Sequence, residues 1–108
     1  MILAVDSGVV VAVALVQQSA PKSPIFFLKF VAVAATERRT GRHLGDLIFE
    51  RVLNWCAART TILAETELIL AAKIHPANSS SEKWAQRNGF RMVRSDIPLR
   101  LWELIAEL

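Results

Sequence analysis

Arg38-Arg39-Thr40-Gly41-Arg42-His43-Leu44-Gly45 is the stretch that decides the fold of this chain. It lies between an apolar run at residues 25–35, which predicts a strand, and a helically periodic run at residues 44–59. The first N–H groups of a helix lack partners within the helix, and the helix dipole adds partial positive charge there. Glycine lets a phosphate approach the backbone closely. This turn therefore predicts a site for a phosphate-bearing ligand.

The composition is that of one folded domain spanning residues 1–108. Apolar residues make up 53% of the chain, which excludes a disordered protein. The longest unbroken apolar stretch, residues 9–16, is far shorter than the roughly 20 residues of a membrane helix. Asp6 stands where a signal peptide would carry basic residues, and the single cysteine allows no internal disulfide. We therefore expect a cytoplasmic protein with no membrane span.

The distribution of charge favours a small anionic ligand. The chain has 13 basic residues against 10 acidic ones, and Arg38, Arg39 and Arg42 cluster in the turn. A protein that binds nucleic acid usually spreads its basic residues along a face. Two less favoured interpretations remain. One is a small nucleic-acid-binding domain that uses these arginines, and the other is an arginine cluster that is merely solvated.

Turn residues, β-branched residues and apolar runs predict the elements before and within the first helix. Residues 1–5 and 9–17 are expected to form a hairpin around Asp6-Ser7-Gly8. The nearly continuous apolar run at residues 25–35 fits a strand buried on both faces. Three- and four-residue steps predict one buried stripe along the helix. That stripe comprises Leu44, Leu47, Ile48, Val52, Trp55 and Cys56, with Cys56 as an inert buried thiol.

The second half of the chain predicts a strand at residues 68–72, with residues 62–67 unassigned. A capping box at Ser79 and Glu82 would start a short helix that ends near Asn88. Gly89 is suited to the left-handed backbone conformation that often follows the last turn of a helix. Phe90 is placed to make the hydrophobic contact that often accompanies this conformation. Residues 90–94 predict a strand, and residues 99–105 a last strand or a helix.

Two segments together resemble one family. The turn matches Arg/Gln-x-x-Gly-x-Gly/Ala except at His43, and Asn78-Ser79-Ser80-Ser81-Glu82-Lys83-Trp84-Ala85-Gln86-Arg87-Asn88-Gly89-Phe90 matches Asn-x-x-Ala/Ser followed by Gly-Phe after a short helix. Over residues 25–94 the chain resembles the GCN5-related N-acetyltransferase (GNAT) family. The resemblance implies an α/β (α+β) fold with a mixed, mostly antiparallel sheet of about five to six strands and two main helices.

The resemblance also implies a ligand, acetyl-CoA or another acyl-CoA. The strand before the turn would pair its backbone with the pantetheine arm, and residues 41–46 would hold the pyrophosphate through main-chain N–H groups. Asn78 would hydrogen-bond the pantetheine side. The implied cofactor-binding residues are Val33, Ala34, Ala35, Arg38, Arg39, Gly41, Arg42, His43, Leu44, Gly45, Asp46 and Asn78.

The chain departs from the family pattern where acid–base groups are usual. Ala85 stands in place of a tyrosine general acid, and Lys73 in place of a glutamate base. Trp84, beside Ala85, has no acidic proton to give. No catalytic residue is therefore assigned, and no metal site is expected. Candidates to replace the missing groups are His75, Ser81 and, acting through water, Glu65 or Glu67.

Only about forty residues precede Gly41, whereas family members usually carry a further strand and two helices that wall the acceptor site. We expect an apolar part of the sheet to be exposed and to bind a homodimer partner or another protein. Two functions remain open. One is an acyl-CoA-dependent N-acetyltransferase acting on an unknown amine, and the other is a catalytically inactive CoA-binding or interaction module.

Overall fold

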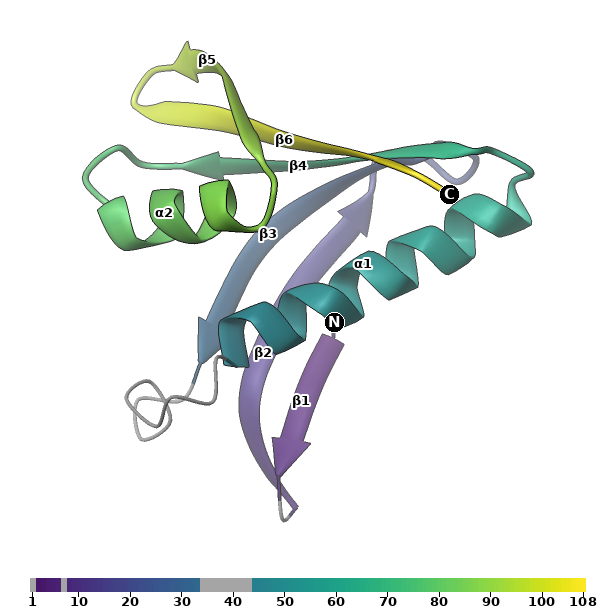
Figure 1. The fold of residues 1–108 in the computed structure, drawn as a ribbon, viewed down its shortest axis with the longest axis horizontal. Helices are drawn as coiled ribbons and strands as arrows, with labels where there is room; N and C mark the ends of the chain where they lie inside the picture. The colour runs from purple at the N-terminus through teal and green to yellow at the C-terminus, as the bar shows by residue number, and fades with distance from the viewer. Residues whose placement is uncertain (1, 7, 34–43) are drawn as a thin grey trace.

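The structure is a computed structural model that describes residues 2–6, 8–33 and 44–108. Two helices and six strands lie within these residues (Figure 1). In chain order they are β1 (Ile2–Asp6), β2 (Val9–Gln18), β3 (Ile25–Val33), α1 (Leu44–Ile62), β4 (Glu67–Ile74), α2 (Ser79–Arg87), β5 (Arg91–Asp96) and β6 (Leu99–Glu107).

The strands form one sheet in the order β1-β2-β3-β4-β6-β5. All neighbouring pairs are antiparallel except β3 and β4, which are parallel. A parallel pair needs a crossover, and α1 supplies it. The predicted mixed, mostly antiparallel sheet with two helices is confirmed. The last segment is a strand rather than a helix, because β6 pairs along its length with β4.

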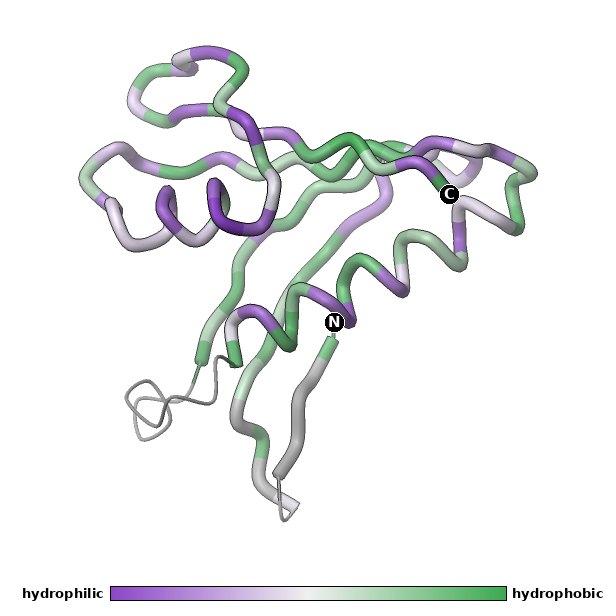
Figure 2. Tube along the Cα trace, in the orientation of Figure 1, coloured by the Kyte–Doolittle hydropathy of each residue, from purple (hydrophilic) through white to green (hydrophobic). Residues whose placement is uncertain are grey.

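Helix α1 packs on the sheet through a stripe of side chains four residues apart. Leu44, Ile48, Val52 and Cys56 are buried there, and Figure 2 shows hydrophobic and hydrophilic residues alternating along the helix. Leu47 was predicted to be in this stripe, but it is 39% exposed. The buried side chains Phe49 and Thr60 complete the face.

Both helices contribute to the same hydrophobic core, and among the described residues no helix covers the other face of the sheet. On β3, Phe26 and Leu28 are buried, whereas Ile25 and Phe27 are exposed. The prediction that this strand is buried on both faces is therefore wrong. Successive side chains of a strand point to opposite faces, and helices cover only one of them here.

Helix α2 is capped differently from the sequence prediction. Asn78, not Ser79, is the N-cap, and its side-chain oxygen accepts a hydrogen bond from the Ser81 N–H. The predicted capping box is wrong because Glu82 turns to donors on β6. The end of the helix is as predicted: Gly89 has a φ of 92°, and Phe90 is buried.

The unassigned residues 62–67 lie between α1 and β4. Helix α1 ends at Ile62, Ala64 has a left-handed φ of 59°, and β4 begins at Glu67. Within the described part of the chain, neither helix is long and apolar enough to cross a membrane.

Candidate functional site

Strands β3 and β4 diverge after a short parallel contact. They pair at only three positions, from Ile25 with Ile69 to Phe27 with Ala71. Beyond these, β3 follows β2 as far as Val33, and β4 follows β6 as far as Ile74. Figure 1 shows β3 curving away from β4. Within the described residues, positions 28–32 of β3 therefore have no strand partner on the side that faces β4.

A cleft of about 610 Å³ occupies this divergence. Its walls come from β3, β4, the loop after β4, α2 and Gly45 at the start of α1. Lys73, His75 and Arg87 line it, and no Asp or Glu among the described residues does so. The basic lining favours an anionic ligand, although Lys73 is ion-paired with Asp96 and Arg87 with Asp46.

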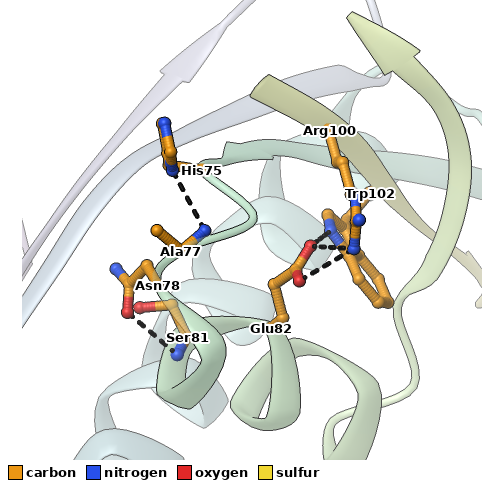
Figure 3. Close-up of polar contacts among 7 residues, drawn as sticks. All are labelled: His75, Ala77, Asn78, Ser81, Glu82, Arg100 and Trp102. Carbon is orange, nitrogen blue, oxygen red and sulfur yellow. Dashed lines mark hydrogen bonds and ion pairs between the residues drawn. The ribbon is translucent and has the colours of Figure 1, made fainter. Parts of the chain in front are cut away.

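The loop between β4 and α2 presents two oriented side chains to the cleft (Figure 3). Asn78 Oδ1 accepts hydrogen bonds from Ser81 N at 3.3 Å and from Ser80 Oγ at 3.2 Å. His75 Nδ1 accepts one from Ala77 N at 3.0 Å. This bond assigns the ring proton of a neutral His75 to Nε2. The Asn78 amide nitrogen and His75 Nε2 can therefore act as donors to a ligand.

A cluster of three side chains holds α2 against β6. Arg100 Nη1 and Trp102 Nε1 both donate to the Glu82 carboxylate at 3.1 Å (Figure 3). The Glu82 side chain is 13% exposed. Because the carboxylate satisfies two donors of β6, it fixes the position of the helix that forms one wall of the cleft.

The start of α1 lies against α2 at Trp84. The Trp84 ring packs edge-on against the Phe49 ring, with the two centroids 5.5 Å apart. The centroid of the Phe90 ring is 6.1 Å from that of Trp84. Trp84 Nε1 is buried and has no hydrogen-bond partner among the residues that the structure describes. A Cβ added to Gly45 would come within 3.2 Å of this nitrogen. A glycine at this position therefore keeps a small space open between α1 and the indole.

Only some of the residues predicted to bind the cofactor can be placed. Val33, Gly45 and Asn78 line the cleft, Asp46 lies in the first turn of α1, and Leu44 is in the core. The others lie outside the described residues. These are Ala34, Ala35, Arg38, Arg39, Gly41, Arg42 and His43.

The candidates for acid–base chemistry are separated by the fold. His75 and Ser81 line the cleft, whereas Glu65 and Glu67 lie at or before the other end of β4. Lys73, which was not assigned as a base, also lines the cleft. The side chain of Ala85 is fully buried in the core, so the position of the usual tyrosine carries no group into the cleft.

The sequence pattern does not indicate Trp84 or Arg87 as parts of the site, although both line it. Their spacing from Ser80 and Ser81 on one helix face is the signal that could have identified them.

No family model matches the sequence, and no curated protein does so either. Solved structures do match. The PaiA N-acetyltransferase from Thermoplasma acidophilum, in complex with coenzyme A, is similar over 94% of this chain and 57% of its own, with a TM-score of 0.76 and 14% identity. The chain has the GNAT fold.

Two further GNAT acetyltransferases share this fold. The ribosomal-protein-S18-alanine N-acetyltransferase from Escherichia coli covers 95% of this chain with a TM-score of 0.68 and 16% identity. Tetrahymena GCN5 also covers 95%, with a TM-score of 0.68 and 16% identity. This chain spans 57%, 64% and 65% of the lengths of these three GNAT structures. Likeness at such low identity establishes the fold, as the motif resemblance predicted.

Proposed function

We propose that residues 1–108 form a single acyl-CoA-binding domain that transfers an acetyl group, or another acyl group, to an amine. The observation that carries this proposal is the cleft between the diverging strands β3 and β4, bordered by the start of α1. The presence of coenzyme A in a structure with the same fold supports it.

The described residues fit such a ligand. The edge of β3 at residues 28–32 offers main-chain N–H and C=O groups to the amides of the pantetheine arm. The Asn78 amide nitrogen offers one more donor on the opposite wall. The start of α1 suits the diphosphate because its first N–H groups and its dipole favour anions. Lys73 and Arg87 add positive charge to the lining.

In the proposed reaction the neutral amine attacks the thioester carbonyl, a C–N bond forms and the C–S bond breaks. The amine loses one proton and the departing CoA thiolate gains one, both by exchange with water. His75 Nε2–H is one of the two oriented side-chain donors described for the cleft, and it stabilises the negative charge that develops on the reacting group. Most of the rate enhancement then comes from positioning the two reactants.

The amine reaches the thioester from the other face of the sheet. A second cavity of about 340 Å³ lies there, and it shares Leu28, Ala72 and Lys73 with the cleft. The two cavities therefore meet where β3 and β4 separate, so an acceptor in one can contact an acyl group in the other.

A CoA-binding module without catalysis is the second candidate. It is favoured by the burial of Ala85 in the core and by the ion pair between Lys73 Nζ and Asp96 at 3.1 Å. This ion pair directs the Lys73 ammonium group toward β5. The hydrogen bond and the charge of Lys73 in turn lower the pKa of Asp96 from its usual value.

Calorimetry with acetyl-CoA followed by a thiol-release assay tests both candidates. We expect heat of binding for acetyl-CoA and release of free CoA when an active amine is present. No binding at millimolar acetyl-CoA contradicts both candidates. Binding without thiol release across panels of small amines, polyamines and peptide N-termini supports the module instead of the enzyme.

We propose that the protein is cytoplasmic. We also propose that the exposed face of the sheet binds a protein partner. Ile25, Phe27 and Ile105 are exposed on the side away from both helices. Because exposed apolar side chains of this size favour burial, we propose that a second copy or another protein covers them. Sedimentation at micromolar concentration tests the homodimer, and a monomer there contradicts it.

A further inference from the structure

The second cavity, on the face of the sheet away from both helices, combines an apolar wall with two lysines. Phe27, Ala71 and Leu101 form the wall, and the charged lining residues are Lys29 and Lys73. Ala71 and Leu101 are buried, although neither belongs to the core beneath the helices. The cavity therefore offers both apolar surface and positive charge to a ligand.

The two lysines differ in what they contact. Lys73 Nζ lies 3.1 Å from Asp96 Oδ2 of β5, so a carboxylate already neutralises part of its charge. Lys29 Nζ lies over the Phe27 ring, 5.3 Å from the ring centroid, and forms no ion pair with a described residue. The Lys29 ammonium is therefore available to a ligand, and it lies beside an exposed aromatic ring.

The other acidic residues on this face lie outside the cavity. Glu103 of β6 is opposite Ala71, and its neighbour on the far side is Arg91 of β5. Glu67 and Glu107 face each other at the other end of β4 and β6. Because no described Asp or Glu lines the cavity, none competes there with an anionic ligand.

The cavity meets the cleft at Leu28 and Ala72, which line both. An acyl group bound in the cleft ends at this junction, so the attacking amine lies there as well. The rest of the acceptor then lies against the wall that contains Phe27 and Leu101. The partner proposed for this face of the sheet would cover the cavity from outside.

We infer that the acceptor is an amine that also carries an apolar side chain and a carboxylate, as apolar amino acids do, and that Lys29 binds the carboxylate. The inference rests on the proposed function, and the bonds made and broken are those given there. The apolar side chain is removed from water on the Phe27 wall, and the carboxylate accepts a charge-assisted hydrogen bond from Lys29 Nζ. Polyamines are disfavoured, because their additional cationic groups meet like charge.

Calorimetry of the chain saturated with CoA tests the class with three reaction products. N-acetylphenylalanine, its neutral amide and N-acetylglycine all lack an amine that titrates, so the comparison does not depend on amine protonation. We expect the amide to bind about 5-fold more weakly than N-acetylphenylalanine, as for loss of an exposed ion pair. N-acetylglycine, which has no ring to bury, should bind at least 10-fold more weakly.

Lys29→Gln should abolish the difference between N-acetylphenylalanine and its amide, because it removes the charge and keeps most of the side chain. Lys22→Gln, in the exposed loop between β2 and β3, is the matched control and should keep the difference. A difference that persists in Lys29→Gln overturns the role of Lys29.

The outcomes separate the inference from the proposed function. If the wild-type chain binds no CoA, the proposed function fails. If it binds CoA but does not distinguish N-acetylphenylalanine from its amide, only the acceptor class fails. Thiol release should be at least 10-fold faster with phenylalanine than with spermidine at equal concentration. Faster release with spermidine, or no release with either amine, contradicts the acceptor class.

Discussion

The carboxylate of Asp46 lies 2.8 Å from Arg87 Nη2, which joins the first turn of α1 to the last turn of α2. Asn88 Nδ2 donates to the same oxygen at 3.1 Å. These contacts position the two helix ends that border the proposed diphosphate site. They also place a negative charge beside it and neutralise part of the charge of Arg87.

Asp46→Asn is expected to tighten acetyl-CoA binding by about 2- to 10-fold, because it removes a like charge and releases Arg87 toward the ligand. The protein should lose about 1 kcal/mol of stability, since an exposed ion pair and a favourable helix-end charge are lost. Calorimetry and urea unfolding measure the two effects. Glu50→Gln on the exposed side of α1 is the control, and weaker binding by Asp46→Asn would contradict the expectation.

Gly45→Ala should separate ligand binding from stability. The new methyl group would come within 3.2 Å of Trp84 Nε1 and would narrow the cleft beside the first turn of α1. Alanine favours a helix by up to about 1 kcal/mol over glycine, which offsets the close approach. We expect the unfolding free energy to change by less than about 1 kcal/mol and the Kd for acetyl-CoA to rise at least 10-fold. Unchanged affinity in calorimetry would contradict a ligand that lies against the first turn of α1 beside Gly45.

Glu82→Ala should destabilise the protein by about 2–4 kcal/mol, because Arg100 and Trp102 Nε1 lose their shared acceptor in a mostly buried place. Glu82→Gln keeps an acceptor for Trp102 and should lose less than half as much. Urea unfolding of both variants gives the comparison. Equal losses would show that the charge, and not the hydrogen bond to Trp102, holds α2 in place.

His75→Ala should lower kcat about 10- to 100-fold if the chain is an acetyltransferase, because it removes the oriented donor of the cleft. The Kd for acetyl-CoA should change less than 3-fold. His75→Gln, which keeps a side-chain N–H, is expected to recover part of the rate. Turnover is followed by thiol release, and an unchanged kcat in His75→Ala would remove His75 from the mechanism.

The Cys56 thiol should make the protein less stable above pH 9. Burial raises its pKa from 9.0 to about 12, although the nearby Arg59 charge lowers it slightly. Between these two values the unfolded chain has lost the proton and the folded chain has kept it. Stability from this group is therefore full below pH 9.0 and falls by about 1.4 kcal/mol per pH unit as the pH rises toward 12.

Urea unfolding at pH 8 and pH 10 measures this effect. In the control variant Cys56→Ala, the unfolding free energy should fall less between these two pH values, because the thiol is absent. The folded protein should also resist iodoacetamide at pH 8 and react after unfolding, because the thiol is buried and protonated. Rapid alkylation of the folded protein would contradict this environment.

Much of the fold follows from local sequence patterns. Residues 9–17 are rich in β-branched residues after a turn, which favours a strand, and residues 44–59 have the period of a helix. Gly89 with Phe90 marks the end of α2 through geometry that only neighbouring residues decide. These predictions succeed because hydrogen bonds within a turn and the spacing of apolar residues involve nearby parts of the chain.

The sequence by itself determined most of the strands and both helices, where α2 ends and what class of ligand the turn before α1 favours, but not that residues 99–107 form a strand. Only the tertiary structure decided that β3 is covered on one face, that Glu82 binds β6 instead of capping its own helix, and that Leu47 is exposed while Phe49 is buried. It also brought Trp84 against Gly45 across 39 positions of the sequence. Contacts between distant elements depend on how the helices and strands pack in three dimensions, and no local period of the sequence encodes that packing.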